Sequence, residues 1–120
     1  MAMNIISAGL ALLLIAAPLP TRAQGVKAAA PTAAALQQGC DAGDAKACEG
    51  LAEKLPANDP QAPPLFRKAC DGGVPIACTV LGMMYYVGRG VPEDKDQATV
   101  LLRKACAGGD STGCAMVPKN

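Results

Sequence analysis

The chain has 120 residues, of which 51% are hydrophobic and only 2% aromatic, and its formal net charge is +1. A near-neutral chain with no basic block and almost no aromatic side chains has little to offer a nucleic acid, so we expect no nucleic-acid partner. Histidine is absent and the six cysteines do not form closely spaced C-x2-4-C hooks, so we expect no metal and no cofactor.

The first 23 residues resemble a secretory signal peptide. Residues 5–17 form an uncharged apolar run, and Thr21–Ala23 offers a small-x-small cleavage site before Gln24. A membrane anchor is the alternative, but this run is shorter than the roughly 20 apolar residues that span a bilayer. We therefore expect cleavage near Ala23, no membrane association afterwards, and a periplasmic or secreted bacterial protein.

Residues 24–35 are rich in alanine and contain Pro31, which predicts a flexible lead-in before a repeat domain over residues 36–120. All six cysteines of that domain fall into pairs with one C-x7-C spacing: Cys40 and Cys48, Cys70 and Cys78, and Cys106 and Cys114. Eight residues rise about 12 Å along a helix, whereas bonded cysteines have Cα atoms roughly 4.4–6.8 Å apart. If each pair is bonded, the chain folds back between its two cysteines. Disulfides also agree with export to an oxidising compartment.

The cysteine pairs belong to a longer internal repeat. Arg67–Cys70 recurs as Arg103–Cys106, a period of 36 residues, whereas Cys70 follows Cys40 after only 30. The missing six residues correspond to the turn at 87–90, which has no counterpart at 55–58.

Helix signals follow the same register. One apolar stripe at helical spacing is repeated, at Ala62, Leu65, Phe66 and Ala69 and again at Ala98, Leu101, Leu102 and Ala105. Asp94 with Gln97 reads as a capping box before the second stripe, and Asn58 with Gln61 as its equivalent before the first. Pro63 and Pro64 are expected to delay or distort the start of that first helix.

Each first cysteine is followed three residues later by a helix-ending glycine, Gly43, Gly73 or Gly109. We expect Asp44 and Asp110 to cap the next helix at the first and last of these turns. A longer helix over residues 75–87 would have one apolar packing side, made by Ile76, Ala77, Val80, Leu81, Met84 and Tyr85. Gly82 in its middle costs about 1 kcal/mol against alanine, which a close helix–helix contact would explain. The prediction is an all-α fold of repeated helix–turn–helix units.

The segment Leu81–Val91, followed by Asp94, Ala98 and Arg103–Cys106, resembles a Sel-one-like repeat, a relative of the tetratricopeptide repeats. The cysteine spacing at each turn is similar to that of the secreted cysteine-rich subgroup, the Hcp family. The resemblance covers about residues 36–116, as a partial first hairpin, a shortened repeat, a full repeat and a partial C-terminal cap. It implies an α/α-hairpin solenoid stapled by disulfides between neighbouring helices. It also implies structural roles for the signature residues Leu81, Gly82, Tyr85, Gly88, Gly90, Ala98 and Ala105.

The resemblance implies a binding module, because members of the wider family act mainly as scaffolds or adaptors. Members of the cysteine-rich subgroup have also been described as binding or hydrolysing β-lactams, which is the alternative function. A serine acyl-enzyme needs a base near its nucleophile. After signal removal the only serine is Ser111, in an S-x-x-C context without K-T-G. We therefore predict no catalytic residue and a partner that is an unknown protein or peptide. A purely structural fragment of a larger assembly is a third possibility.

Met83 and Tyr86 on the longer helix are the candidate partner-binding residues, with core packing as the alternative. The basic pairs Arg67–Lys68 and Arg103–Lys104 either complement helix dipoles or form a ladder for an acidic partner. The cysteines are interpreted as structural rather than nucleophilic, and Gly88 and Gly90 as an inter-helix turn rather than a phosphate loop. Neither the partner nor the oligomeric state follows from the sequence.

Overall fold

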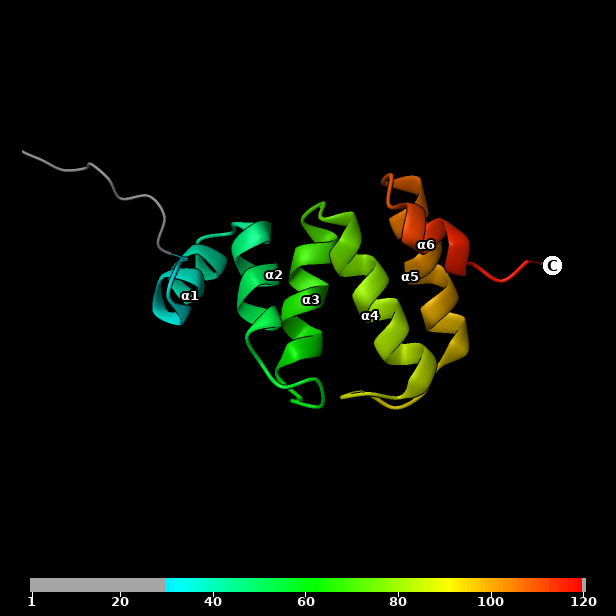
Figure 1. Cartoon of the computed structure of the whole chain (residues 1–120), viewed down its shortest axis with the longest axis horizontal. Helices are drawn as coiled ribbons and strands as arrows, with labels where there is room; N and C mark the ends of the chain where they lie inside the picture. The colour runs from blue at the N-terminus through cyan, green and yellow to red at the C-terminus, as the bar shows by residue number, and fades with distance from the viewer. Residues whose placement is uncertain (1–29, 120) are drawn as a thin grey trace, which may run out of the picture. The chain divides into compact units, whose positions relative to one another are not determined.

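The computed structural model describes residues 30–119, which are entirely helical apart from turns. Six helices follow one another: α1 (Ala33–Asp41), α2 (Ala45–Glu53), α3 (Ala62–Asp71), α4 (Pro75–Val87), α5 (Lys95–Ala107) and α6 (Ser111–Met116). Each helix packs against the next in the sequence, and α4 also contacts α6, as the row of helices in Figure 1 shows. The predicted all-α repeat fold is confirmed, whereas the predicted signal peptide and residues 24–29 lie outside the described residues.

Helix α1 begins earlier than the predicted domain boundary at residue 36. Thr32 is its N-cap, and the Thr32 hydroxyl accepts a hydrogen bond from the Ala35 N–H at 3.1 Å. A capping threonine satisfies an otherwise unpaired donor of the first turn. The helical domain thus includes residues 33–35, which the sequence analysis assigned to the lead-in.

The three turns between a first cysteine and its partner, which we call the junctions, share one backbone geometry. In each, a glycine takes a left-handed φ of 99° (Gly43 and Gly73) or 102° (Gly109). The glycine N–H donates to the carbonyl of the first cysteine at 3.0–3.1 Å, and the next residue donates to the carbonyl five positions earlier at 2.9–3.0 Å. These paired hydrogen bonds close the last turn of a helix. The predicted helix ends are confirmed.

The residue after each of these glycines already caps the following helix, so a junction contains no linker residues. The Asp44 carboxylate accepts from the Lys46 and Ala47 N–H groups, and the Asp110 carboxylate from the Gly113 N–H. Both predicted caps are confirmed. The middle junction has Val74 as N-cap without a side-chain hydrogen bond, and Pro75 follows it. Proline suits this position because its missing N–H would have no helical partner there.

The two caps predicted for the longer helix connections differ in outcome. The Asp94 carboxylate accepts from the Gln97 N–H at 3.0 Å, so the predicted N-cap is confirmed. The Asp94 N–H donates to the Tyr85 carbonyl at 2.8 Å instead of to the Gln97 side chain, so the second bond of the predicted capping box does not form. The Asn58 cap is wrong: α3 begins at Ala62 after Gln61, which makes no side-chain cap. Asp59 instead accepts from the Gln61 N–H at 2.8 Å. The turn at Asp59 delays the start of α3, so that Pro63 and Pro64 fall in its first turn. Proline is tolerated there but not in the helix interior.

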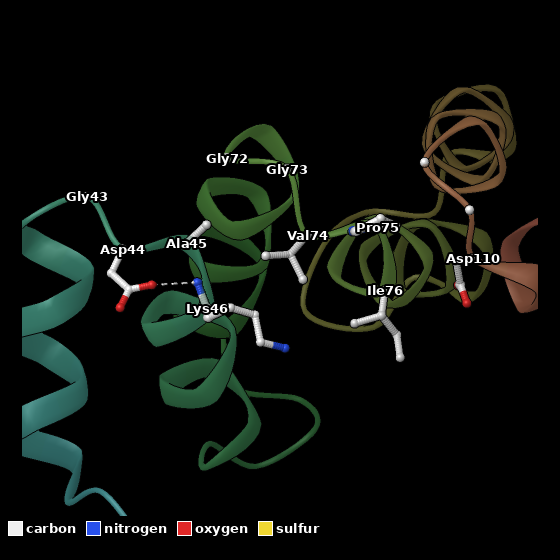
Figure 2. A pocket seen from close by; sticks show the side chains of 12 residues that line it. Gly43, Asp44, Ala45, Lys46, Gly72, Gly73, Val74, Pro75, Ile76 and Asp110 are labelled. Carbon is white, nitrogen blue, oxygen red and sulfur yellow. Dashed lines mark hydrogen bonds between the residues drawn. The ribbon is translucent and has the colours of Figure 1, made fainter.

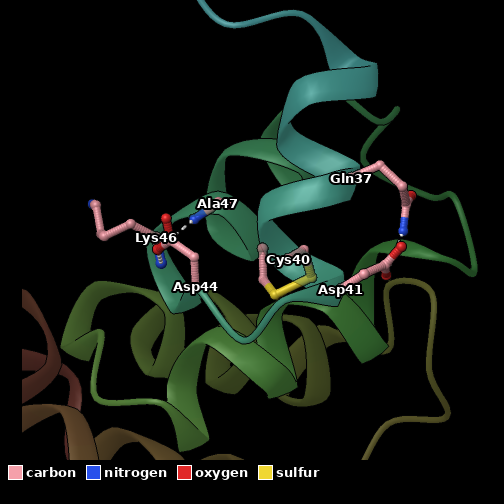
Figure 3. The surroundings of a disulfide bond; sticks show 7 residues. Gln37, Cys40, Asp41, Asp44, Lys46 and Ala47 are labelled. Atoms are coloured by element: carbon pink, nitrogen blue, oxygen red, sulfur yellow. Dashed lines mark hydrogen bonds between the residues drawn. A yellow bond between two sulfur atoms is a disulfide. The ribbon is translucent and has the colours of Figure 1, made fainter.

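All three cysteine pairs are bonded, with Cα–Cα distances of 4.5 Å for Cys40–Cys48, 4.7 Å for Cys70–Cys78 and 4.4 Å for Cys106–Cys114. Each bond joins the last turn of one helix to the first turn of the next, as Figure 3 shows for the first junction. The first two disulfides are buried, whereas Cys114 is exposed and Cys106 half-buried.

The core is built from small and aliphatic side chains between these stapled helices. Leu81 and Leu102 are each 1% exposed, and Ala98 and Ala105 are fully buried. A Cβ on Gly82 would lie 3.1 Å from Leu102 Cγ, so this glycine allows α4 and α5 to approach closely. The remaining signature residues lie at the same hairpin: Tyr85 is half-buried, and Gly88 and Gly90 both have a φ of 74° in the turn.

One predicted packing residue is exposed instead. Ile76 was expected on the apolar packing side of the longer helix, but its side chain is 50% exposed. It lies in the first turn of α4, where the neighbouring helices do not cover it. Helical periodicity identifies which residues share a face, but it does not show how far along that face the neighbouring helices extend.

Candidate functional site

The three junctions together line one open depression, which we call the junction groove. Its volume is about 680 Å³, and its lining comes from residues 43–46, 72–76 and 108–110. Figure 2 shows Val74 and Ile76 in the middle of the groove, with Lys46 on one side and Asp110 on the other. Because the junctions share one geometry, the repeated fold itself places the starts of α2, α4 and α6 beside this groove.

The polar groups of the groove are largely engaged within the protein. Lys46 forms an ion pair with Glu49, whose side chain is only 7% exposed. The hydrogen bond and the charge of Glu49 raise the pKa of the Lys46 ammonium. The buried carboxylate therefore has a compensating charge at the groove edge, as a buried charge requires.

Asp110 at the other side is engaged twice. The Thr79 hydroxyl, which is buried in α4, donates to the Asp110 carboxylate. This hydrogen bond is the main cause that lowers the pKa of Asp110, and the backbone N–H groups of Gly113 and Thr112 lower it further. The contact links α4 directly to α6. What the groove offers a ligand is therefore mainly the apolar surface of Ile76.

Ile76 begins an apolar row along α4, which we call the α4 stripe: Ile76, Val80, Met83 and Val87. Its members lie at i, i+4, i+7 and i+11, which is one face of a helix. Ile76 is 50%, Met83 42% and Val87 58% exposed, whereas Val80 is half-buried against the core. A row of exposed apolar side chains on one helix face is unusual for a surface that only meets water.

The stripe continues from the junction groove into a second cavity. This cavity has a volume of about 370 Å³ and lies between the end of α2 and α4; Leu55, Phe66, Val80 and Met84 are among its lining residues. Ile76 lines the groove and Val80, one turn further along α4, lines the second cavity. The two depressions thus follow the same helix face.

The predicted partner-binding residues are both exposed on α4, but they have different neighbours. Met83 is part of the α4 stripe, whereas Tyr86, 43% exposed, lies beside the start of α5 with its ring centroid 4.4 Å from the Lys95 ammonium nitrogen. Ile76 and Val87, the other exposed members of the stripe, were not predicted as binding residues. Their spacing of i and i+11 was visible, but their exposure depends on helix neighbours that the sequence does not show.

The residues considered for chemistry are not brought together. Ser111 is the exposed first residue of α6, and none of the side-chain hydrogen bonds among residues 30–119 involves its hydroxyl. Within the same residues no group of three or more His, Cys, Asp or Glu side chains could hold a metal ion. No helix there is long and apolar enough to cross a membrane.

Two of the four residues of the basic pairs have side-chain partners within the protein. Lys104 of α5 forms an ion pair with Asp71 of α3 at 3.1 Å, and Arg67 donates to the Tyr85 hydroxyl at 3.2 Å. Lys68 and Arg103 are exposed. The four residues therefore do not form one continuous basic ladder.

The comparisons with solved structures agree with this architecture. The chain is similar to Helicobacter pylori cysteine rich protein B (TM-score 0.66, 24% identity, 70% of this chain and 68% of that one). It is also similar to a Sel1 repeat protein from Oxalobacter formigenes (TM-score 0.61, 32% identity, 68% and 66%). A protective antigen of uropathogenic Escherichia coli with an SLR fold matches over only 19% of its own length (TM-score 0.63, 24% identity, 68% of this chain).

No curated protein sequence matches the chain. The Sel1 repeat model, however, matches residues 46–74 and 75–110, which are α2–α3 and α4–α5 with their junctions. These two matches cover more than half of the chain and follow the boundaries of the structural repeats. The chain belongs to the Sel1 repeat family.

Proposed function

We propose that this protein is an exported repeat module that binds an apolar segment of another protein along the α4 stripe. The observation that carries the proposal is the stripe itself, three of whose four side chains are 42–58% exposed. Sel1 repeats are protein-interaction modules, and two residues of the stripe line depressions on one helix face, Ile76 the junction groove and Val80 the second cavity. An extended or helical segment with apolar side chains is the partner that such a surface fits.

Export is part of the proposal. It is supported by three disulfides, which persist in oxidising compartments, and by the apolar run at residues 5–17. Amino-terminal sequencing of the protein isolated from the periplasm or the medium should begin at Gln24. Recovery of the full-length chain from the cytoplasm would contradict this part of the proposal.

The binding surface can be tested with a photo-crosslinking residue at position 83 of α4 or position 100 of α5. Val100 is the control because it is as exposed as Val87 (both 58%) but belongs to a different helix. We expect one specific cross-linked partner from position 83 and none from position 100. Equal products from both positions, or none from either, would contradict a partner-binding stripe.

A pair of matched variants sharpens this test. Val87→Asp places a charge in the stripe, whereas Val100→Asp places the same charge at equal exposure outside it. Val87→Asp should weaken cross-linking from position 83 by tenfold or more, because burying a carboxylate against an apolar segment is unfavourable. Val100→Asp should leave this cross-linking unchanged. Both variants should unfold at the same temperature as the parent protein within a few degrees.

A further inference from the structure

A small pocket forms where the start of α3 meets the end of α4 and the turn that follows it. Its volume is about 310 Å³, and it is lined by three prolines of the α3 start together with Arg67, Tyr85, Gly90 and Val91. We call it the arginine pocket. It shares no lining residue with the junction groove or the α4 stripe, so a ligand bound there is independent of the proposed protein partner.

Arg67 supplies the only charge in this lining. The side chain is half-buried, one guanidinium N–H donates to the Tyr85 hydroxyl at 3.2 Å, and the guanidinium carbon lies 5.8 Å from the Tyr85 ring centroid. None of the ion pairs within residues 30–119 involves Arg67. A guanidinium has five N–H donors; one donates to the neutral Tyr85 hydroxyl, and none has a charged acceptor in the described part of the chain.

Asp59, the acidic residue of the adjoining turn, is not a charged acceptor for Arg67. The Asp59 backbone carbonyl approaches Gly90, but the Asp59 carboxylate accepts from the Gln61 N–H at 2.8 Å. Asp59 is also absent from the lining of the pocket. The arginine pocket is therefore a half-buried cation between apolar proline and valine walls, with a tyrosine hydroxyl beside it.

We propose that the arginine pocket binds a carboxylate group carried on a small apolar body. The planar guanidinium matches a carboxylate through two parallel hydrogen bonds, and the Tyr85 hydroxyl can donate a third. The proline and valine walls favour an apolar attachment. A phosphate monoester, which carries about 1.5–2 negative charges, would lack a second cation in this lining.

The size of the pocket limits the ligand further. A volume of about 310 Å³ is at the lower end of the roughly 300–1,000 Å³ of small-molecule sites. It suits the terminal residue of a peptide, or a free aliphatic acid of similar size. Both sources present the same carboxylate, and the experiment distinguishes them.

The test uses the exported chain with its disulfides intact and four probes. Two probes, N-acetyl-Ala-Leu and hexanoate, carry a carboxylate. The other two, N-acetyl-Ala-Leu amide and hexanamide, are their neutral counterparts. Titrations followed by amide NMR should give saturable shifts at residues 67, 85 and 90 with both acids. The amides should bind at least tenfold more weakly, because a neutral amide cannot form the charge-assisted hydrogen bonds of a carboxylate to the guanidinium.

The chain offers a matched arginine as control. Arg67 and Arg103 occupy the same place in the repeated Arg-Lys-Ala-Cys sequence, but Arg103 is exposed. Arg67→Gln should weaken acid binding at least tenfold, Arg103→Gln should leave it within twofold, and Tyr85→Phe should weaken it severalfold. Tighter binding of the acetylated dipeptide assigns the pocket to peptide C-termini, whereas tighter binding of hexanoate assigns it to free acids.

The proposal is overturned if neither acid gives saturable shifts, if acids and amides bind equally, or if Arg103→Gln weakens binding as much as Arg67→Gln. The comparison of acid with amide needs only the unaltered protein. It therefore decides the question even if Arg67→Gln fails to fold.

Discussion

The two Sel1 repeats of this chain share their junctions but differ in length. The first repeat has helices of 9 and 10 residues, α2 and α3, whereas α4 and α5 of the second have 13 residues each. The first repeat lacks the glycine turn of the second, where Gly88 and Gly90 both have a φ of 74°. The disulfide junctions thus tolerate repeats of different length between them.

The repeats also differ in the face that their first helices expose. Aligning Cys48 with Cys78 places Lys46, Gly50 and Glu53 of α2 where α4 has the stripe residues Ile76, Val80 and Met83. The junction is the same in both repeats, whereas the exposed face of the first helix is polar in one and apolar in the other.

The largest expected effect concerns the core of the two repeats. Leu101 of the second repeat is 2% exposed, whereas its counterpart Leu65 in the first is only half-buried. Leu101→Ala should lower the free energy of unfolding by about 2–5 kcal/mol, and Leu65→Ala by clearly less. Urea unfolding with intact disulfides measures both. Equal losses would mean that the shortened repeat is packed as well as the full one.

The disulfides should give the next largest effect. Each closes a loop of sequence separation 8, so removing one should cost about 2–3 kcal/mol through the unfolded chain. Replacing Cys70 and Cys78 by alanine should cost more than replacing Cys106 and Cys114, because the first pair is only 1–2% exposed and truncation there leaves a cavity.

Limited reduction tests the same difference without mutation. With small amounts of dithiothreitol, the Cys106–Cys114 bond should open first, because Cys114 is exposed. Alkylation of the released thiols and peptide mapping would identify it. Simultaneous opening of all three bonds would contradict this order.

The cap of the first repeat should have a smaller effect. Asp44→Ala removes the acceptor of the Lys46 and Ala47 N–H groups and should cost about 1 kcal/mol. Asp44→Asn is the control, because asparagine caps a helix nearly as well. Thermal unfolding should place the asparagine variant close to the parent protein. A loss equal to that of the alanine variant would show that the cap contributes through its charge.

The smallest effect concerns Thr79 and Asp110, a pair that the first repeat lacks because Glu49 stands at the equivalent position. The Thr79 hydrogen bond lowers the pKa of Asp110 below its ordinary value of 3.8. A lowered pKa in the folded state stabilises the protein above pH 3.8, and this contribution is lost as the pH falls through the lowered value.

Thr79→Val should therefore destabilise the protein at neutral pH, and its difference from the parent should shrink below pH 3.8. Thermal midpoints measured from pH 7 to pH 2 test this. A difference that stays constant over this range would contradict the pKa linkage and indicate that the threonine acts only through packing.

The junctions could be predicted because their signals are local. Glycine, the capping aspartates and the cysteine spacing all lie within nine residues of sequence, and the contacts that they make are equally local. The Asn58 cap failed because a run of prolines follows it and the chain instead turns at Asp59. Where two local signals conflict, as the Asn58 cap and the following prolines do, the sequence does not show which of them sets the start of the helix.

The candidate sites depend on contacts between distant residues. The exposure of Ile76 depends on how far the neighbouring helices reach, and the arginine pocket requires Arg67 to meet Tyr85, 18 residues further along the chain. Met83 could be proposed from its place on the helix, but the stripe around it could not. Periodicity defines faces, whereas the fold decides which of them remain open.

The position of the junctions inside the disulfide loops has a consequence for proteolysis. A protease that cut the backbone at Gly43, Gly73 or Gly109 would cleave between two bonded cysteines, so the fragments would stay covalently joined. The connections at 54–61 and 88–94 lie outside these loops. Cuts in these two connections would release separate pieces, and those pieces would be whole hairpins, each still closed by its own cross-link.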